Sequence, residues 1–179
     1  KTITSLATRE SGLVLSLYNN SVLSVIEENE LVQSRRVEYE LVLDREGGRW
    51  TIPVCMELTL ERDSRYLDCK LTLTNTAEDH RLRVHFPTDI KIDKNYSGSP
   101  FDQIERPQKS PYKRDRQHPN TSYVGLEKNG RGMAVLNSGL YEYEHLKDGT
   151  LALTLLRAVG RISGDWKLRH KVIETWKTE

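Results

Sequence analysis

Hydrophobic and polar residues alternate with a period of two along most of the chain, in short runs. Successive side chains of a strand point to opposite faces of a sheet, so each run predicts a strand with one apolar face. Turn-forming pairs such as Asp63-Ser64 and Asn129-Gly130 separate the runs. No segment has a helical stripe of more than three turns. The pattern predicts an all-β fold, a large antiparallel β-sandwich that forms one domain over residues 1–179. The runs cover residues 13–17, 22–26, 37–43, 52–60, 67–73, 82–86, 133–136, 140–143 and 151–155.

Residues 94–121 break the alternation and predict a long loop. The segment contains four prolines and has six basic residues against three acidic ones. Connections longer than about 12–15 residues are usually functional or disordered. We expect Tyr96, Phe101 and Ile104 to be packed rather than free in water, whereas residues 108–118 are equally well explained as a solvated excursion.

The two cysteines, Cys55 and Cys69, lie on neighbouring predicted strands. If residues 62–65 form the turn between these strands, Leu58 lies opposite Cys69. Cys55 then points to the other face of the sheet, because side chains alternate with period two. The register predicts two free thiols, which is typical of a reducing compartment. We therefore expect a cytoplasmic protein.

The first half of the 94–121 segment carries the candidate site residues, where residues 99–107 read SPFDQIERP. Asp102 and Glu105 are candidates for an acid/base pair, since glycosidases use two carboxylates about 5–9 Å apart. Glu105 is equally a candidate for a local ion pair with Arg106. The planar guanidinium of Arg106 suits a carboxylate, a phosphate or sugar hydroxyls. Its alternative is a structural salt bridge to Asp102 or Glu105.

Overall composition limits the function further. The net charge is +1, from 27 basic and 26 acidic residues, so no global field favours nucleic acid or an anionic membrane. No window approaches the ~20 apolar residues of a membrane span, and Lys1 does not open a signal-peptide pattern. The five histidines do not pair at metal-ligand spacing, since His80 and His85 fall on opposite faces of one strand. We find no catalytic set and no metal site within the chain.

Five ordered segments of this sequence resemble the C-terminal β-domain of the α-mannosidase family of glycoside hydrolases (family 38). The nearest likeness is to the bacterial branch that includes mannosylglycerate hydrolases. Together with residues 50–76, which resemble the strand pair before them, the segments are spread over residues 50–160, about two thirds of the chain. The segments are LTNTAEDHRLRVHFPT at residues 73–88, SPFDQIERP at 99–107, GRGMAVLN at 130–137, GLYEYE at 139–144 and LTLLRAVG at 153–160.

The resemblance implies a piece of a multidomain, retaining α-mannosidase with a galactose-mutarotase-like supersandwich. In that family an N-terminal (β/α) barrel carries a zinc ion, an aspartate nucleophile and a second carboxylic acid. Nothing in the chain matches the barrel, so we expect the fragment to be inactive without its own N-terminal catalytic domain, with an α-mannoside as the parent's substrate. Family members continue beyond Lys177-Thr178-Glu179, which implies a sandwich that is incomplete at the C-terminus. An exposed sheet edge there would favour homo-oligomers.

The resemblance also suggests that residues 99–107 reach the rim of the substrate pocket. We expect Arg106 to orient the sugar or an anionic aglycone, Asp102 to fix Arg106, and Phe101 to anchor the loop, with Glu105 beside them. The basic residues of 108–116 would meet a phosphate or a glycerate carboxylate. One alternative is a free-standing carbohydrate-binding module with Trp166 and Trp176 as its platform. The other is a purely structural module that caps the barrel or joins subunits.

Overall fold

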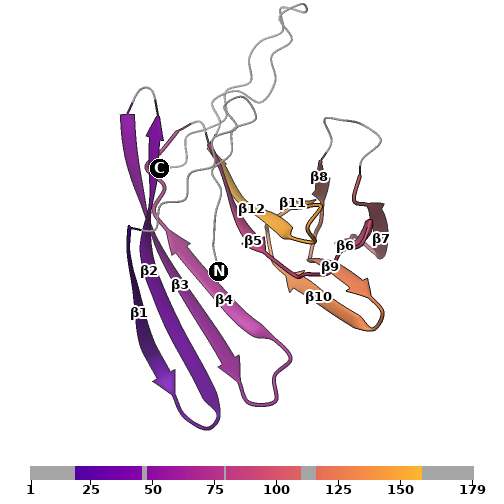
Figure 1. Cartoon of the computed structure of the whole chain (residues 1–179), viewed down its shortest axis with the longest axis horizontal. Coiled ribbons are helices and arrows are strands. Elements are labelled where there is room, and N and C mark those ends of the chain that lie inside the picture. Colours follow the sequence, from indigo (N-terminus) through magenta and orange to yellow (C-terminus); the bar gives the residue numbers. More distant parts are fainter. Residues whose placement is uncertain (1–18, 46–47, 79, 110–115, 159–179) are drawn as a thin grey trace, which may run out of the picture. The chain divides into compact units, whose positions relative to one another are not determined.

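The computed structural model of the protein describes residues 19–45, 48–78, 80–109 and 116–158, and every regular element in these ranges is a β-strand (Figure 1). The strands form three antiparallel sheets of four strands each, which confirms the predicted all-β sandwich. The described residues fall into two compact units: Arg81–Arg157 form one unit, and the described residues up to His80, together with Ala158, form the other. The single domain over residues 1–179 stays a prediction.

The unit of residues 19–80 is one antiparallel meander in the order β1-β2-β3-β4. Its strands are β1 (Asn19–Glu28), β2 (Val32–Arg45), β3 (Gly48–Glu61) and β4 (Leu67–Leu73). One face of the sheet is mostly apolar, as the alternation predicts, with Gln33 and Arg35 of β2 as polar positions toward one end. The apolar face includes the cross-strand row Leu23, Val37, Met56 and Leu71.

The opposite face of this sheet carries a charged row. Arg36 pairs with Glu57 at 2.6 Å, and Glu57 accepts a second contact from Lys70 at 3.0 Å. The three residues lie directly opposite one another in the register of β2, β3 and β4. Hydrogen bonds to Arg36 and Lys70 hold the pKa of Glu57 below its ordinary value. The row is consistent with the two-faced character of the sheet.

The predicted register of the cysteine strands is confirmed. Leu58 lies opposite Cys69, and Cys55 lies opposite Thr72 on the other face. Both cysteines are free thiols. The cytoplasmic location inferred from them stays a prediction.

The unit of residues 81–157 contains two sheets, in the orders β10-β9-β6-β7 and β5-β12-β11-β8. The first consists of β6 (Lys94–Ser99), β7 (Asp102–Pro107), β9 (Tyr123–Lys128) and β10 (Arg131–Leu136). The second consists of β5 (His80–Phe86), β8 (Gln117–Pro119), β11 (Glu142–His145) and β12 (Leu151–Ala158).

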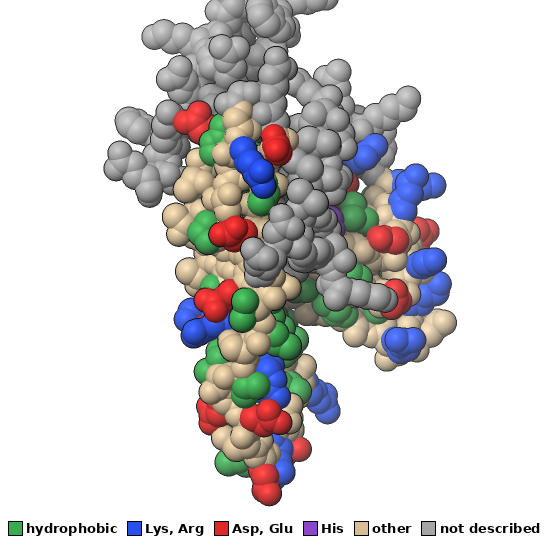
Figure 2. All heavy atoms as spheres, turned by 60° about the vertical axis from the view of Figure 1, so that its left-hand side comes forward, with side chains coloured by type: hydrophobic (Ala, Val, Ile, Leu, Met, Phe, Trp, Pro, Cys, Tyr) green, Lys and Arg blue, Asp and Glu red, His purple; other side chains and the backbone are tan. Residues whose placement is uncertain are grey.

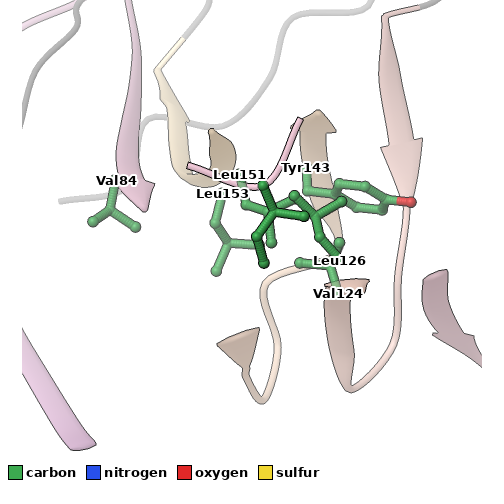
Figure 3. Close-up of a cluster of buried hydrophobic side chains, with 7 residues drawn as sticks. Val84, Val124, Leu126, Tyr143, Leu151 and Leu153 are labelled. Atoms are coloured by element: carbon green, nitrogen blue, oxygen red, sulfur yellow. The ribbon is translucent and has the colours of Figure 1, made fainter. Parts of the chain in front are cut away.

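Side chains from both sheets of this unit form its hydrophobic core. Val124 and Leu126 of β9 meet Leu151 and Leu153 of β12, and Tyr143 of β11 lies at the edge of the same cluster. Figure 3 shows the Tyr143 side chain extending from the cluster with its hydroxyl pointing away from Leu151 and Leu153. The core therefore ends on one side at a polar atom.

The prediction of one long loop over residues 94–121 is wrong for residues 94–99, 102–107 and 117–119, which form strands. β6 and β7 form a hairpin through the tight turn at Pro100-Phe101, and β8 follows and ends at Pro119. The alternation was hidden because the buried positions of β6 are Asn95 and Ser97, which are polar. Hydrophobic periodicity cannot detect a strand whose inward side chains are an amide and a hydroxyl.

The structure does not describe the C-terminal residues on which two expectations depend. The incomplete C-terminal edge falls at residues 159–179, outside the described residues, and so do Trp166 and Trp176. Among the described residues, no helix has the length and hydropathy needed to cross a membrane.

Candidate functional site

The candidate site lies along the β6–β7 hairpin, whose two faces carry different groups. Asn95 lies opposite Arg106, and Ser97 lies opposite Ile104. Ser97 also pairs with the core residue Val124 of β9, so this set faces the interior between the two sheets. The next pair along, Tyr96 and Glu105, lies on the outer face. The register thus separates Arg106 from Glu105, although they are neighbours in sequence.

A buried polar cluster fills the inner side of the hairpin beside the hydrophobic core. We call the set Asn95, Ser97, Arg106, Tyr143 and His145 the inter-sheet cluster. The Tyr143 hydroxyl donates to Asn95 Oδ1 at 2.5 Å, and Asn95 Nδ2 lies 3.4 Å from His145 Nδ1. Asn95 Nδ2 also donates to the Arg106 carbonyl at 3.2 Å, and Arg106 Nε donates to Ser97 Oγ at 3.3 Å. The cluster thus fixes the base of β7 to β6 and β11.

These hydrogen bonds also determine the tautomer of His145. Because Asn95 Oδ1 accepts from Tyr143, the amide nitrogen of Asn95 points to His145. An amide nitrogen only donates, so His145 Nδ1 accepts and its proton sits on Nε2. His145 is 3% exposed, and its Nε2 has no hydrogen-bond partner among the described residues. Burial lowers the pKa of His145, Asp148 opposes this shift and His118 reinforces it, so the neutral ring is favoured.

Arg106 is the charged member of the inter-sheet cluster. Its side chain is half-buried, and no carboxylate pairs with it in the described part of the chain. Burial raises the pKa of Tyr143, while the Ser97 hydroxyl and the Arg106 guanidinium act in the opposite direction. Among the described residues, the hydrogen-bonding partners of the guanidinium are therefore neutral.

The suggested contacts of Arg106 with Asp102 and Glu105 do not form. Asp102 Oδ1 accepts instead from the Gln103 backbone N–H at 2.7 Å. Four residues of strand separate Asp102 from Arg106, about 13 Å at 3.3 Å per residue. Asp102 consequently does not fix Arg106.

The suggested acid/base pair of Asp102 and Glu105 is also not supported by the geometry. Three residues apart on one strand, the two side chains point to opposite faces. Glu105 forms an ion pair at 2.8 Å with Lys94 on the outer face. The hydrogen bond to Lys94 holds the pKa of Glu105 below its ordinary value. A carboxylate that stays ionised in this way is a poor general acid.

Phe101 does not anchor the hairpin in this unit. It lies at the turn with φ of 69°, and its side chain is fully exposed at 108%. The expectation failed because the ring sits at the corner of a tight turn, where it points away from both strands. Ile104, by contrast, faces inward from β7 and is half-buried.

A second polar network lies on the other face of the β5-β12-β11-β8 sheet. Arg83 pairs with Glu144 at 2.6 Å, and both side chains are largely buried. Arg81 and Arg157 both contact Glu142, at 3.3 Å and 2.7 Å. These arginines all have carboxylate partners, in contrast to Arg106. The network is complete in itself and offers no free group for chemistry.

The described residues contain no group of three metal-ligating side chains. His80 and His145 are buried on different strands, and His118 lies against the Tyr143 ring at 5.6 Å between centroids. The basic 108–116 segment falls mostly on residues 110–115, outside the described residues. Its proposed contact with an anion stays a prediction.

Sequence reasoning missed four members of the inter-sheet cluster. Asn95 and Ser97 lie two residues apart on either side of Tyr96, and this spacing fits a strand with a polar inner face. Tyr143 and His145 also alternate with Glu142 and Glu144 on β11. Histidines were considered only as metal ligands, so a histidine that accepts from an amide was overlooked.

Comparison with known proteins gives a family, a curated relative and solved structures of the same fold. Residues 8–161 match the family model described as glycosyl hydrolases family 38 C-terminal domain. A putative mannosylglycerate hydrolase of Halalkalibacterium halodurans is 36% identical over 132 residues, which cover 70% of this chain and 14% of that protein. The chain thus spans a small part of the curated relative that it matches.

Two solved structures share the fold. An α-mannosidase from Enterococcus faecalis V583 superimposes with a TM-score of 0.78 at 24% identity, over 89% of this chain and 21% of that one. A protein in glycosyl hydrolase family 38, also from Enterococcus faecalis, gives a TM-score of 0.76 at 24% identity, over 87% and 21%. At this identity the two structures support the fold alone.

Proposed function

Since the chain belongs to the glycosyl hydrolase family 38 C-terminal domains, we propose that it is the accessory β-domain of a retaining α-mannosidase-type enzyme. In this proposal the domain packs on the catalytic part of the parent protein. Its β6–β7 hairpin contributes Arg106 to the substrate pocket. The domain is inactive alone, because the described residues contain no catalytic pair.

One observation carries the role of Arg106: it is a half-buried guanidinium without a carboxylate partner among the described residues. Burying an unpaired charge is costly unless a partner arrives. The relative from Halalkalibacterium halodurans is named a putative mannosylglycerate hydrolase, and the glycerate part of mannosylglycerate carries a carboxylate. We therefore assign Arg106 to the anionic aglycone or to sugar hydroxyls, which a guanidinium can bind with two parallel hydrogen bonds.

The rest of the chemistry belongs to the parent protein in this proposal. The described residues do not fit a zinc ion, so the zinc and the aspartate nucleophile expected from the resemblance are placed in the N-terminal catalytic barrel. What this chain supplies is a rigid sheet that holds one cation and excludes water around its base.

The test is Arg106→Ala in the full-length enzyme, with mannosylglycerate and a neutral α-mannoside as substrates. Loss of a charged hydrogen bond costs about 1.5–3 kcal/mol, so kcat/KM on the anionic substrate should fall roughly 10- to 150-fold. The loss should be smaller on the neutral substrate. Arg131→Ala, an exposed arginine at the start of β10, is the matched control and should leave both values unchanged.

An unchanged kcat/KM in Arg106→Ala would contradict the role of this residue. The accessory role is tested separately, with the isolated 179-residue chain beside its full-length parent, both supplied with zinc. Activity in the parent alone supports the proposal. Sugar binding by the isolated chain would favour a carbohydrate-binding module instead.

A further inference from the structure

The turn of the β6–β7 hairpin breaks two local rules at one residue. Phe101 has φ of 69°, a left-handed conformation that is an outlier for a bulky side chain. Glycine or asparagine would fit this position at lower conformational cost. The ring is also fully exposed to solvent, at 108%. Positions where local preferences conflict with the structure are often functional.

The turn is nevertheless held in place by several contacts. The Thr121 backbone N–H donates to the Gly98 carbonyl at 3.0 Å, and the Tyr123 hydroxyl donates to Gln103 Oε1. A Cβ at Gly98 would overlap the Ser122 hydroxyl, so β6 lies tightly against the neighbouring chain. Phe101 is therefore presented at a fixed place in front of its unit.

We propose that Phe101 inserts into an apolar pocket on the remaining part of the parent polypeptide and fixes the hairpin against it. This inference rests on the accessory-domain function proposed above. The chain covers 14% of its curated relative, so most of such a parent is available as the partner. Burial of the ring in a pocket would offset the cost of the turn conformation, since phenylalanine gains as much from burial as any aliphatic side chain.

A protein pocket explains Phe101 better than a sugar ring does. Phe101 and Arg106 are five residues apart along an extended chain, which is about 17 Å. They cannot both contact the same monosaccharide. If Arg106 meets the substrate, Phe101 lies beyond it, against the protein that surrounds the pocket.

The experiment compares Phe101→Gly and Phe101→Leu in the full-length enzyme by hydrogen–deuterium exchange without substrate. Glycine relieves the backbone conformation and removes the ring, so the hairpin of this unit is not weakened by the change itself. Loss of a buried phenylalanine should speed exchange of the β6–β7 amides about 10- to 100-fold. Phe101→Leu keeps an apolar side chain and should give an intermediate increase.

Tyr141→Ser is the control, because Tyr141 is another exposed aromatic of the same unit, at 64%. It should leave exchange of the hairpin unchanged. Unchanged exchange in Phe101→Gly would overturn the proposal. If KM rises in this variant while exchange stays unchanged, the ring contacts the sugar and not a protein pocket. The proposed function is read from kcat/KM in Arg106→Ala and this inference from exchange in Phe101→Gly, so the failure of one is distinguished from the failure of the other.

Discussion

At the scale of single residues, Asn95 organises the inter-sheet cluster. It is fully buried, and its amide uses its oxygen toward Tyr143 and its nitrogen toward Arg106 and His145. Removing one partner of such a network leaves a buried polar atom unsatisfied, which costs about 1–3 kcal/mol. The half-buried position of Arg106 therefore depends on residues of β6 and β11 and not only on its own strand.

His145 gives a pH dependence of stability with a defined sign. Burial holds its folded-state pKa below the ordinary value of about 6.5, so between those two values the unfolded chain binds a proton that the folded chain does not. The free energy of unfolding should therefore fall as pH falls below about 6.5, by at most about 1.4 kcal/mol per pH unit for one group. Urea unfolding between pH 5 and 8 measures this slope.

The control for this prediction is His145→Asn, which keeps an acceptor near the Nδ1 position and does not titrate. It should flatten the slope. Burial also lowers the pKa of His85, so part of the slope should remain. If His145→Asn leaves the slope intact while His85→Asn removes it, the assignment to His145 is incorrect.

The roles of individual residues were the least predictable part of the sequence. Asp102, Glu105 and Arg106 look like neighbours when the segment is treated as a loop, but on a strand they are separated by face or by distance. The face of Arg106 depends on the pairing of β7 with β6, which no local pattern of residues 102–107 reveals. The chemistry of the side chains was enough to select Arg106 as a candidate, but its hydrogen-bond partners depend on the register between β6 and β7.

At the scale of elements, the turn between β11 and β12 fixes the loop after β5. Gly149 has φ of 88°, and a Cβ there would overlap the carbonyl of Ile90, a core residue. The Gly149 carbonyl also accepts from Thr88 Oγ1 at 2.7 Å. Two loops thus meet at one glycine.

Gly149→Ala should destabilise the protein by two effects, the left-handed backbone and the steric overlap. Gly139 separates them, because its φ is 84° but a Cβ there has nothing within 4 Å. We expect about 1 kcal/mol for Gly139→Ala, from the backbone conformation alone, and at least about 1 kcal/mol more for Gly149→Ala, as is typical of overpacking. Equal losses in urea unfolding would show that the loop moves aside without cost.

Element prediction succeeded where turn chemistry and alternation agree. Asn129 and Gly130 both have positive φ and join β9 to β10, as expected for a two-residue hairpin turn. The Leu58–Cys69 register followed in the same way from an apolar run on each side of one turn. β6 was not predicted because its inward residues, Asn95 and Ser97, are polar. Their hydrogen-bond partners lie on β7 and β11.

At the scale of the whole molecule, the sheet of β1–β4 leaves much of its apolar face in water. At one end of the face Tyr39 and Ile52 are buried, with 5% and 0% exposure. At the other end Leu23, Val25 and Leu67 are more than half exposed. Figure 2 shows hydrophobic side chains among charged ones on the face that it draws. Several large apolar side chains exposed on one sheet face are typical of an interaction site.

The isolated chain should consequently self-associate as its concentration rises. Sedimentation velocity over a concentration series should show dimers or larger species, and Leu23→Lys with Leu67→Lys should shift the distribution to monomer. Leu31→Lys is the control, since Leu31 is 62% exposed but lies in the β1–β2 turn, outside the paired rows. A monomer at every concentration in the unmodified chain would contradict the prediction.

The hydrogen bonds of Asn95 have a direction. They run from the Tyr143 hydroxyl to the Asn95 amide and on to His145, and they end at an N–H that faces the interior. Aspartate has almost the same shape as asparagine but no donor at the second atom. Asn95→Asp would therefore leave the Arg106 carbonyl facing an oxygen, and it would force His145 to move its proton to Nδ1. A difference of one atom type, and not of size, thus distinguishes two proton arrangements of this protein's interior.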